Sequence, residues 1–196
     1  MKMNAVAVSL ISATVLVCGP SLPASRAFQT GPSGGETEEG ILETEDISVI
    51  LQGSGVWIRI TPMDEEILRY CTEDTRSTYR KMLENQGEAL KSDGDYGYKT
   101  FLISLQGRSE NEVYFDPTEL KIVQQGKFYK PSQIIPISST FDKRILTLYG
   151  TPEMAIYAFS KEIDLTLPLE FKYKELSSNK WDEIIRTVGE AKLRTR

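Results

Sequence analysis

The clearest structural signal in this sequence is a short segment near its C-terminal end. Apolar and charged residues alternate strictly from Leu169 to Lys174 (LEFKYK). Successive side chains of a β-strand point to opposite faces of its sheet, so this alternation is typical of a strand with one buried and one solvated face. The segment therefore predicts a sheet that covers a hydrophobic core.

Other short apolar runs, separated by Gly, Pro, Asn and Asp, predict further strands. They lie at residues 47–51, 56–60, 100–106, 113–115, 120–123, 145–149 and 155–159. Strands and helices do not alternate regularly, which favours antiparallel over parallel sheets. We predict a mainly β protein, an antiparallel β-sandwich of seven to eight strands.

Two helices are expected beside the strands. Helical periodicity runs from about residue 62 to about residue 90, as one long helix inserted after the second strand. Thr61 is the expected N-cap of this helix and Pro62 its first residue. A second amphipathic helix is expected at the C-terminal end, with Asn179 as its cap; it carries Trp181, Ile184, Ile185 and Val188.

The N-terminal residues 1–27 have the layout of a cleavable signal peptide. A positive Lys2 precedes an apolar stretch at residues 5–17, and small residues follow after a helix-breaking Gly-Pro pair. The apolar stretch is shorter than the roughly 20 residues that span a membrane. We expect export to the periplasm or the cell exterior, with cleavage after Ala24 or Ala27 and no transmembrane helix in the mature chain.

Cys18 raises an alternative, because a cysteine directly after an apolar run can be the lipidation site of a tethered lipoprotein. Val17 stands where such signals usually have Gly, Ala or Ser.

Residues 28–46 follow as an expected disordered, acidic linker, with six carboxylates from Glu36 to Asp46. Residues 47–196 are then expected to form a single domain.

The charge of the chain argues against nucleic acid as a partner. Removal of residues 1–27 lowers Lys+Arg from 23 to 21 and leaves 28 Asp+Glu, which shifts the net charge from −5 to −7. An acidic chain repels phosphate backbones.

After removal of residues 1–27, only Cys71 would remain as a thiol, so no intramolecular disulfide is possible. We interpret Cys71 as a buried small side chain, with a disulfide-linked dimer as the alternative.

Catalytic and cofactor chemistry finds little support in the sequence. The chain has no histidine, which excludes catalytic pairs and metal sites that need one. We therefore expect no enzyme activity and no cofactor. Asp93 and Asp95 resemble the start of a calcium loop, but the later acidic positions of such a loop hold Gly97 and Ser104.

Two further sets of side chains remain candidates. A carboxylate pair could in principle support a hydrolase; the available acids are Asp116, Glu119, Asp142, Glu162 and Asp164. Aromatic side chains near turns and strands could form a binding surface; the candidates are Phe128, Tyr129, Phe141 and Tyr149.

Two longer segments carry a family resemblance. They are FDPTELKIVQQGKFYKPSQIIPIS, which contains a G-x-x-Y-x-P turn, and AIYAFSKEIDLTLPLEFKY. Together they resemble immunoglobulin-like domains of exported bacterial proteins, a family of unknown function, over about residues 113–173. The segment ITPMDEEILRY is similar to part of the same group. The resemblance implies an immunoglobulin-like fold and an extracytoplasmic location, and it implies no catalytic residues.

These observations favour a non-enzymatic module of the cell envelope that binds a protein or a wall component. Two other classes stay open. One is an accessory subunit that stabilises a membrane complex, with the acidic linker as its tether. The other is a hydrolase that acts through a carboxylate pair.

Overall fold

The computed structural model describes residues 40–53, 55–87 and 97–195, all of which lie in one compact unit of the chain. The expected signal peptide, most of the expected linker, Cys18, Asp93 and Asp95 lie outside these residues. The described part is mainly β, as predicted, and every strand pair in it is antiparallel.

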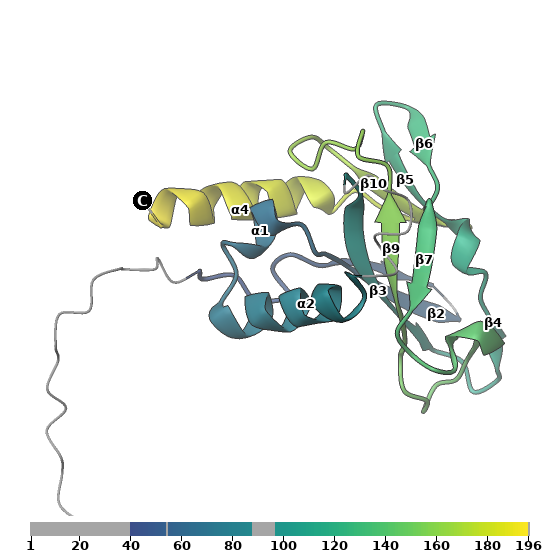
Figure 1. The fold of residues 1–196 in the computed structure, drawn as a ribbon. Coiled ribbons are helices and arrows are strands. Elements are labelled where there is room, and N and C mark those ends of the chain that lie inside the picture. Colours follow the sequence, from purple (N-terminus) through teal and green to yellow (C-terminus); the bar gives the residue numbers. More distant parts are fainter. Residues whose placement is uncertain (1–39, 54, 88–96, 196) are drawn as a thin grey trace, which may run out of the picture. The chain divides into compact units, whose positions relative to one another are not determined.

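The larger sheet has the strand order β1-β2-β3-β9-β7 (Figure 1). Its strands are β1 (Val49–Gln52), β2 (Val56–Pro62), β3 (Lys99–Gly107), β9 (Glu153–Phe159) and β7 (Gln133–Pro136). The second sheet has the order β11-β10-β5-β6. Its strands are β11 (Leu176–Ser178), β10 (Glu170–Tyr173), β5 (Leu120–Gln124) and β6 (Lys127–Tyr129).

A third sheet pairs β4 (Val113–Tyr114) with β8 (Ile145–Leu146), and two 3-10 turns, η1 (Pro117–Glu119) and η2 (Phe141–Lys143), lie between strands. The described residues thus form eleven strands instead of the predicted seven to eight. The three strands that the sequence did not predict are β6, β7 and β11, and their three or four residues are too few for a period of two to be visible.

The core lies between the two larger sheets. Phe101 of β3 packs edge-to-face on Phe171 of β10, with 5.5 Å between ring centroids, and on Phe159 of β9 at 5.7 Å. The three rings are completely buried. The alternation that predicted a strand at 169–174 is confirmed, because Phe171 and Tyr173 of β10 face this core while Glu170 and Lys172 are partly exposed.

The helical insertion after β2 differs from its prediction. It comprises two helices, α1 (Glu65–Leu68) and α2 (Glu73–Asn85), in place of one helix over about 62–90. Pro62 is the last residue of β2, opposite Phe101. Asp64 caps α1 in place of Thr61, and its carboxylate accepts a hydrogen bond from the Glu66 N–H at 3.0 Å.

The break between α1 and α2 has a physical cause in the residues that precede β1. The N–H groups of Ile41 and Leu42 donate to the Tyr70 carbonyl at 2.9 and 3.0 Å, and the Thr72 N–H donates to the Leu42 carbonyl at 2.9 Å. These bonds take backbone groups that a continuous helix would use. Leu42 is buried, so the packed domain includes the end of the expected linker and begins before residue 47.

Gly40 permits this pairing. A Cβ atom at residue 40 would lie 2.0 Å from the carbonyl oxygen of Cys71, so no larger residue fits without a shift of the backbone. The contact fixes segment 40–42, which we call the N-terminal clamp, against residues 70–72.

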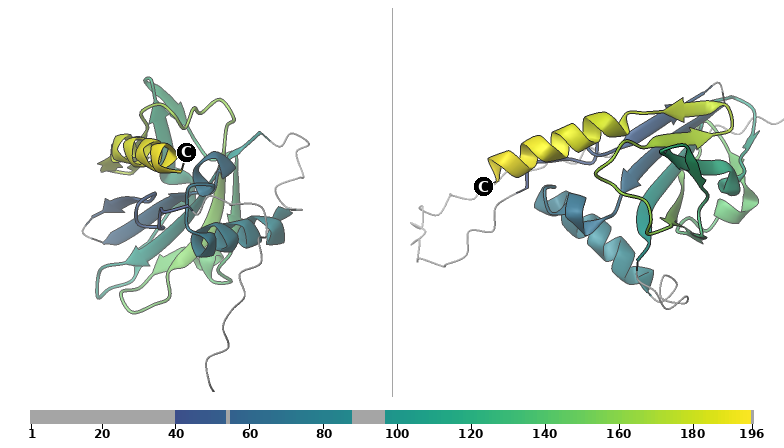
Figure 2. Two further views of the ribbon diagram at one scale, coloured as in Figure 1. Left: turned by 90° about the vertical axis from the view of Figure 1, so that its left-hand side faces the viewer. Right: turned by 90° about the horizontal axis from the view of Figure 1, so that it is seen from above.

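The C-terminal helix α4 (Trp181–Arg194) follows β11. Its N-cap residue is Lys180, not Asn179, and the Ser178 hydroxyl accepts a hydrogen bond from the Lys180 N–H at 3.2 Å. Helices α1, α2 and α4 extend from the same end of the sheets (Figure 2). Among the described residues, no helix combines the length and the apolar character needed to cross a membrane.

Candidate binding groove

A groove of about 220 Å³ lies between the α1 region and α4. On one side it is lined by Ile67 and Tyr70, and on the other by two adjacent rows of α4; the α4 residues are Ile184, Ile185, Val188, Gly189 and Lys192. The loop after β9 contributes Leu165 and Thr166. The groove thus joins three segments that are far apart in the sequence.

The N-terminal end of α4 is firmly attached to the sheets. Trp181 is completely buried, and its ring lies 6.0 Å from that of Phe101 and 5.8 Å from that of Phe171. The indole N–H donates to the Leu165 carbonyl at 3.1 Å, which satisfies the one polar group of this side chain. This single residue therefore joins the α4 wall to both sheets and to the loop that lines the groove.

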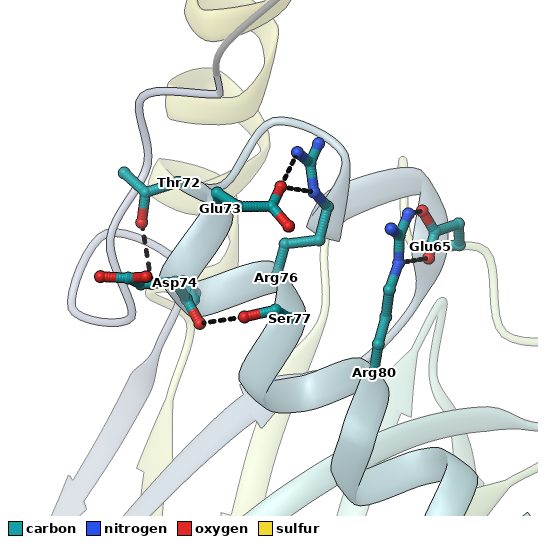
Figure 3. Close-up of polar contacts among 8 residues, drawn as sticks. Glu65, Thr72, Glu73, Asp74, Arg76, Ser77 and Arg80 are labelled. Carbon is teal, nitrogen blue, oxygen red and sulfur yellow. Dashed lines mark hydrogen bonds and ion pairs between the residues drawn. The ribbon is translucent and has the colours of Figure 1, made fainter. Parts of the chain in front are cut away.

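The opposite wall is held by ion pairs around α1. The Lys99 ammonium lies 2.9 Å from the carboxylate of Asp64, at the start of α1. The Arg80 guanidinium of α2 faces Glu65 of α1 (Figure 3), with its Nε 3.1 Å from a Glu65 oxygen. Figure 3 also shows Arg76 turned onto Glu73 within α2. The pairs of Asp64 with Lys99 and of Glu65 with Arg80 connect α1 to β3 and to α2, and the buried Ile67 and Leu68 hold α1 on the core.

The surface of the groove is mainly aliphatic. Ile67 and Ile184 are buried, whereas Tyr70, Ile185 and Val188 are partly exposed. Pockets for drug-sized molecules and cofactors are typically about 300–1,000 Å³. A smaller, open and aliphatic groove suits apolar side chains presented by a partner protein.

The rim of the groove carries more positive than negative charge. Arg69 and Lys192 border it, with Glu66 as the acidic member. The Arg69 guanidinium lies 4.9 Å from the centre of the Tyr70 ring, a cation–π distance that holds the charge at the rim. Neither Arg69 nor Lys192 forms an ion pair with a described residue.

The four aromatic candidates do not form one surface. Phe128 is 62% exposed and Tyr129 partly buried on β6, while Tyr149 is 93% exposed in the turn after β8. Strands β6 and β4, the partner of β8, lie at opposite ends of the sheets (Figure 1). Phe141 is not a surface residue: it is 3% exposed and packs on Phe115, with 5.2 Å between ring centroids.

Four of the five carboxylate candidates serve turns or ion pairs, and the fifth, Asp142, is exposed in η2. Asp116 and Asp164 each accept hydrogen bonds from the hydroxyl and the N–H of a threonine two residues later. Those bonds lower the pKa of both carboxyls, and the ion pair with Lys127 lowers the pKa of Glu162. Glu119 pairs with Lys121. A general acid needs a raised pKa, so these environments do not favour a carboxylate-pair hydrolase.

Cys71 is completely buried beneath the N-terminal clamp. Its thiol is 3.8 Å from the Ile67 carbonyl, and burial raises the pKa of Cys71 to about 12. A thiol in this state is neutral and shielded from solvent, which disfavours the disulfide-linked dimer. In the described part of the chain, no three Cys, Asp or Glu side chains are grouped so as to hold a metal ion.

Three comparisons with known proteins give no match to the chain, neither among family models, nor among curated proteins, nor among solved structures. The interpretation of the groove therefore rests on its geometry alone.

The helical pattern of the sequence placed Ile184, Ile185 and Val188 on one apolar face, but it did not predict the groove. The available signal was the neighbouring pair Ile184 and Ile185, which makes the apolar arc wider than one buried stripe requires.

Proposed function

We propose that this chain is a non-enzymatic binding module of the cell envelope, periplasmic or surface-exposed, that recognises a segment of a partner protein. The observation that carries the proposal is the open aliphatic groove between α1 and α4. Its walls are mainly apolar, with branched aliphatic side chains on α4, which suits a protein ligand better than a wall polysaccharide. Both walls are anchored, so the groove is preformed and costs little ordering free energy on binding.

The location in the envelope rests on the N-terminal sequence pattern. Mass spectrometry of the mature protein tests it: a chain that starts near Ser25 or Phe28 is exported and soluble, and an acylated Cys18 identifies a tethered lipoprotein. An intact N-terminus would contradict export by a cleaved signal.

The immunoglobulin-like assignment, and with it the resemblance to a family of exported bacterial proteins, belongs to the same proposal. Its support is the pair of antiparallel sheets that face each other across Phe101 and Phe171. An experimental structure with a Greek-key connection between the sheets would support the assignment, and a different connection would reject it.

Affinity purification of the full chain tests the binding function. Gly189 offers a blocking variant, because it lines the groove and a Cβ atom there would have no heavy atom within 4 Å. We expect Gly189→Trp to fill the groove without disturbing the fold. Glu190→Trp is the matched control: Glu190 is the next exposed residue of α4 and does not line the groove.

The expected result is a set of partners that co-purify with the wild-type chain and with Glu190→Trp, but are lost with Gly189→Trp. Thermal melting of the three proteins shows whether each is folded. Recovery of the same partners with both variants, or of a bare monomer with the wild-type chain, would refute the proposal.

A further inference from the structure

The α4 wall of the groove has the dimensions of a helix-binding surface. Ile185, Gly189 and Lys192 follow one another at spacings of four and three residues, so they form one stripe along α4. Ile184 and Val188 form the neighbouring row. At 1.5 Å per residue the stripe is about 10 Å long. Two turns of another helix, with apolar residues at i, i+4 and i+7, present side chains over the same length.

Gly189 makes close approach possible in the middle of this stripe. It is exposed, and the space where its side chain would stand is open. A glycine in the middle of a helix costs about 0.5–1 kcal/mol relative to alanine, so the position does not serve the stability of α4. The opening at Gly189 leaves room for a bulky side chain from an opposing helix.

The charges at the rim of the groove indicate which charge the bound partner carries. Arg69 and Lys192 stand on opposite sides of the groove, one after α1 and one in the last turn of α4. Neither has a carboxylate partner among the described residues. The chain as a whole has a net charge of −5, so this net positive rim contrasts with the charge of the rest of the molecule. Acidic residues that flank an apolar stripe would complement it.

We infer that the groove binds a short, acidic amphipathic helix of a partner protein, with aliphatic side chains over Gly189 and carboxylates on Arg69 and Lys192. The inference rests on the binding function proposed above and adds the chemistry of the partner. It places the aliphatic stripe of the partner along Ile185 and Val188, the partly exposed apolar residues of α4.

Two synthetic peptides of about 14 residues, or about four helical turns, test the inference. Both carry leucines at i, i+4 and i+7; one is flanked by Glu and the other by Lys. We expect the Glu peptide to bind the wild-type chain, and the Lys peptide to bind at least about tenfold more weakly. Fluorescence anisotropy of labelled peptides at low and high salt measures both affinities.

The double variant Arg69→Gln, Lys192→Gln should weaken binding of the Glu peptide by about five- to tenfold, as the loss of two exposed ion pairs predicts. Arg194→Gln is the matched control, because Arg194 shares the last turn of α4 with Lys192 and does not line the groove. It should change the affinity by less than about twofold. Gly189→Trp should abolish binding and Glu190→Trp should not.

Several results would overturn the inference. Equal binding of both peptides, or an equal effect of Arg194→Gln and the double variant, would show that the rim does not select acidic partners. Binding of neither peptide would also overturn it. If vesicles of anionic lipid then bind in an Arg69- and Lys192-dependent way, the face contacts membrane instead. In each case the binding function stands if Gly189→Trp alone removes the co-purified partners, and falls if it does not.

Discussion

Replacement of Trp181 by Phe should loosen the attachment of α4 to the sheets. The smaller ring keeps most contacts with Phe101 and Phe171, but it cannot donate the 3.1 Å hydrogen bond to the Leu165 carbonyl. A buried carbonyl without a partner costs about 1–3 kcal/mol, and the lost ring atoms about 1 kcal/mol more. We therefore expect the free energy of unfolding to fall by about 2–4 kcal/mol, a large part of the 5–15 kcal/mol typical of a domain.

Urea denaturation of the full chain, followed by far-UV circular dichroism, measures this loss. In thermal melting the same loss corresponds to a decrease of about 4–16 °C in Tm. Trp57→Phe is the matched control, since Trp57 is the other tryptophan and is partly exposed on β2. It should cost less than about 1 kcal/mol. If Trp181→Phe costs no more than Trp57→Phe, Trp181 does not anchor α4 and the described origin of the groove wall is wrong.

Three further predictions concern stability and accessibility. Gly189→Ala should raise Tm by about 2–4 °C, because alanine favours a helix by up to about 1 kcal/mol and meets no atom within 4 Å; an unchanged or lower Tm would mean that the space is not open. In a Cys18→Ser variant, Cys71 should not react with a thiol reagent at about pH 8 until urea unfolds the chain, because its pKa is raised to about 12; rapid labelling of the folded variant would refute its burial. The Thr166 bonds hold the pKa of Asp164 below its ordinary value of 3.8, so their stabilisation is complete above that value and is lost as the pH falls through the lowered pKa. Asp164→Asn should therefore make the acid-induced fall in the free energy of unfolding shallower, as measured by urea titration at several pH values, and an unaltered slope would contradict this assignment.

The sequence predicted those parts of the fold that local periodicity determines. The alternation around Phe171 identified β10, and the apolar spacing around Ile184 identified α4. The prediction of a single helix over about 62–90 was wrong. The break between α1 and α2 depends on hydrogen bonds from Leu42, about 30 residues earlier in the chain. Periodicity within a segment contains no information about such a distant partner.

The candidate site was less predictable for the same reason. Phe141 is an aromatic residue beside a turn, and its burial depends on Phe115, which belongs to another segment. The groove requires Tyr70, Leu165 and Val188 to meet, and no local pattern relates these positions. Charge could be counted from the sequence, but the concentration of two cations at one rim depends on the packing of α4 beside α1.

The N-terminal clamp also defines how the domain would respond to a mechanical load. A pulling force applied through the residues before Gly40 reaches the domain first at the hydrogen bonds between segment 41–42 and residues 70–72. Rupture of these few bonds would uncover Cys71 and free the Tyr70 carbonyl from the N–H groups of Ile41 and Leu42. A force from the N-terminal side would thus act on the Tyr70 side of the groove before it acts on β1.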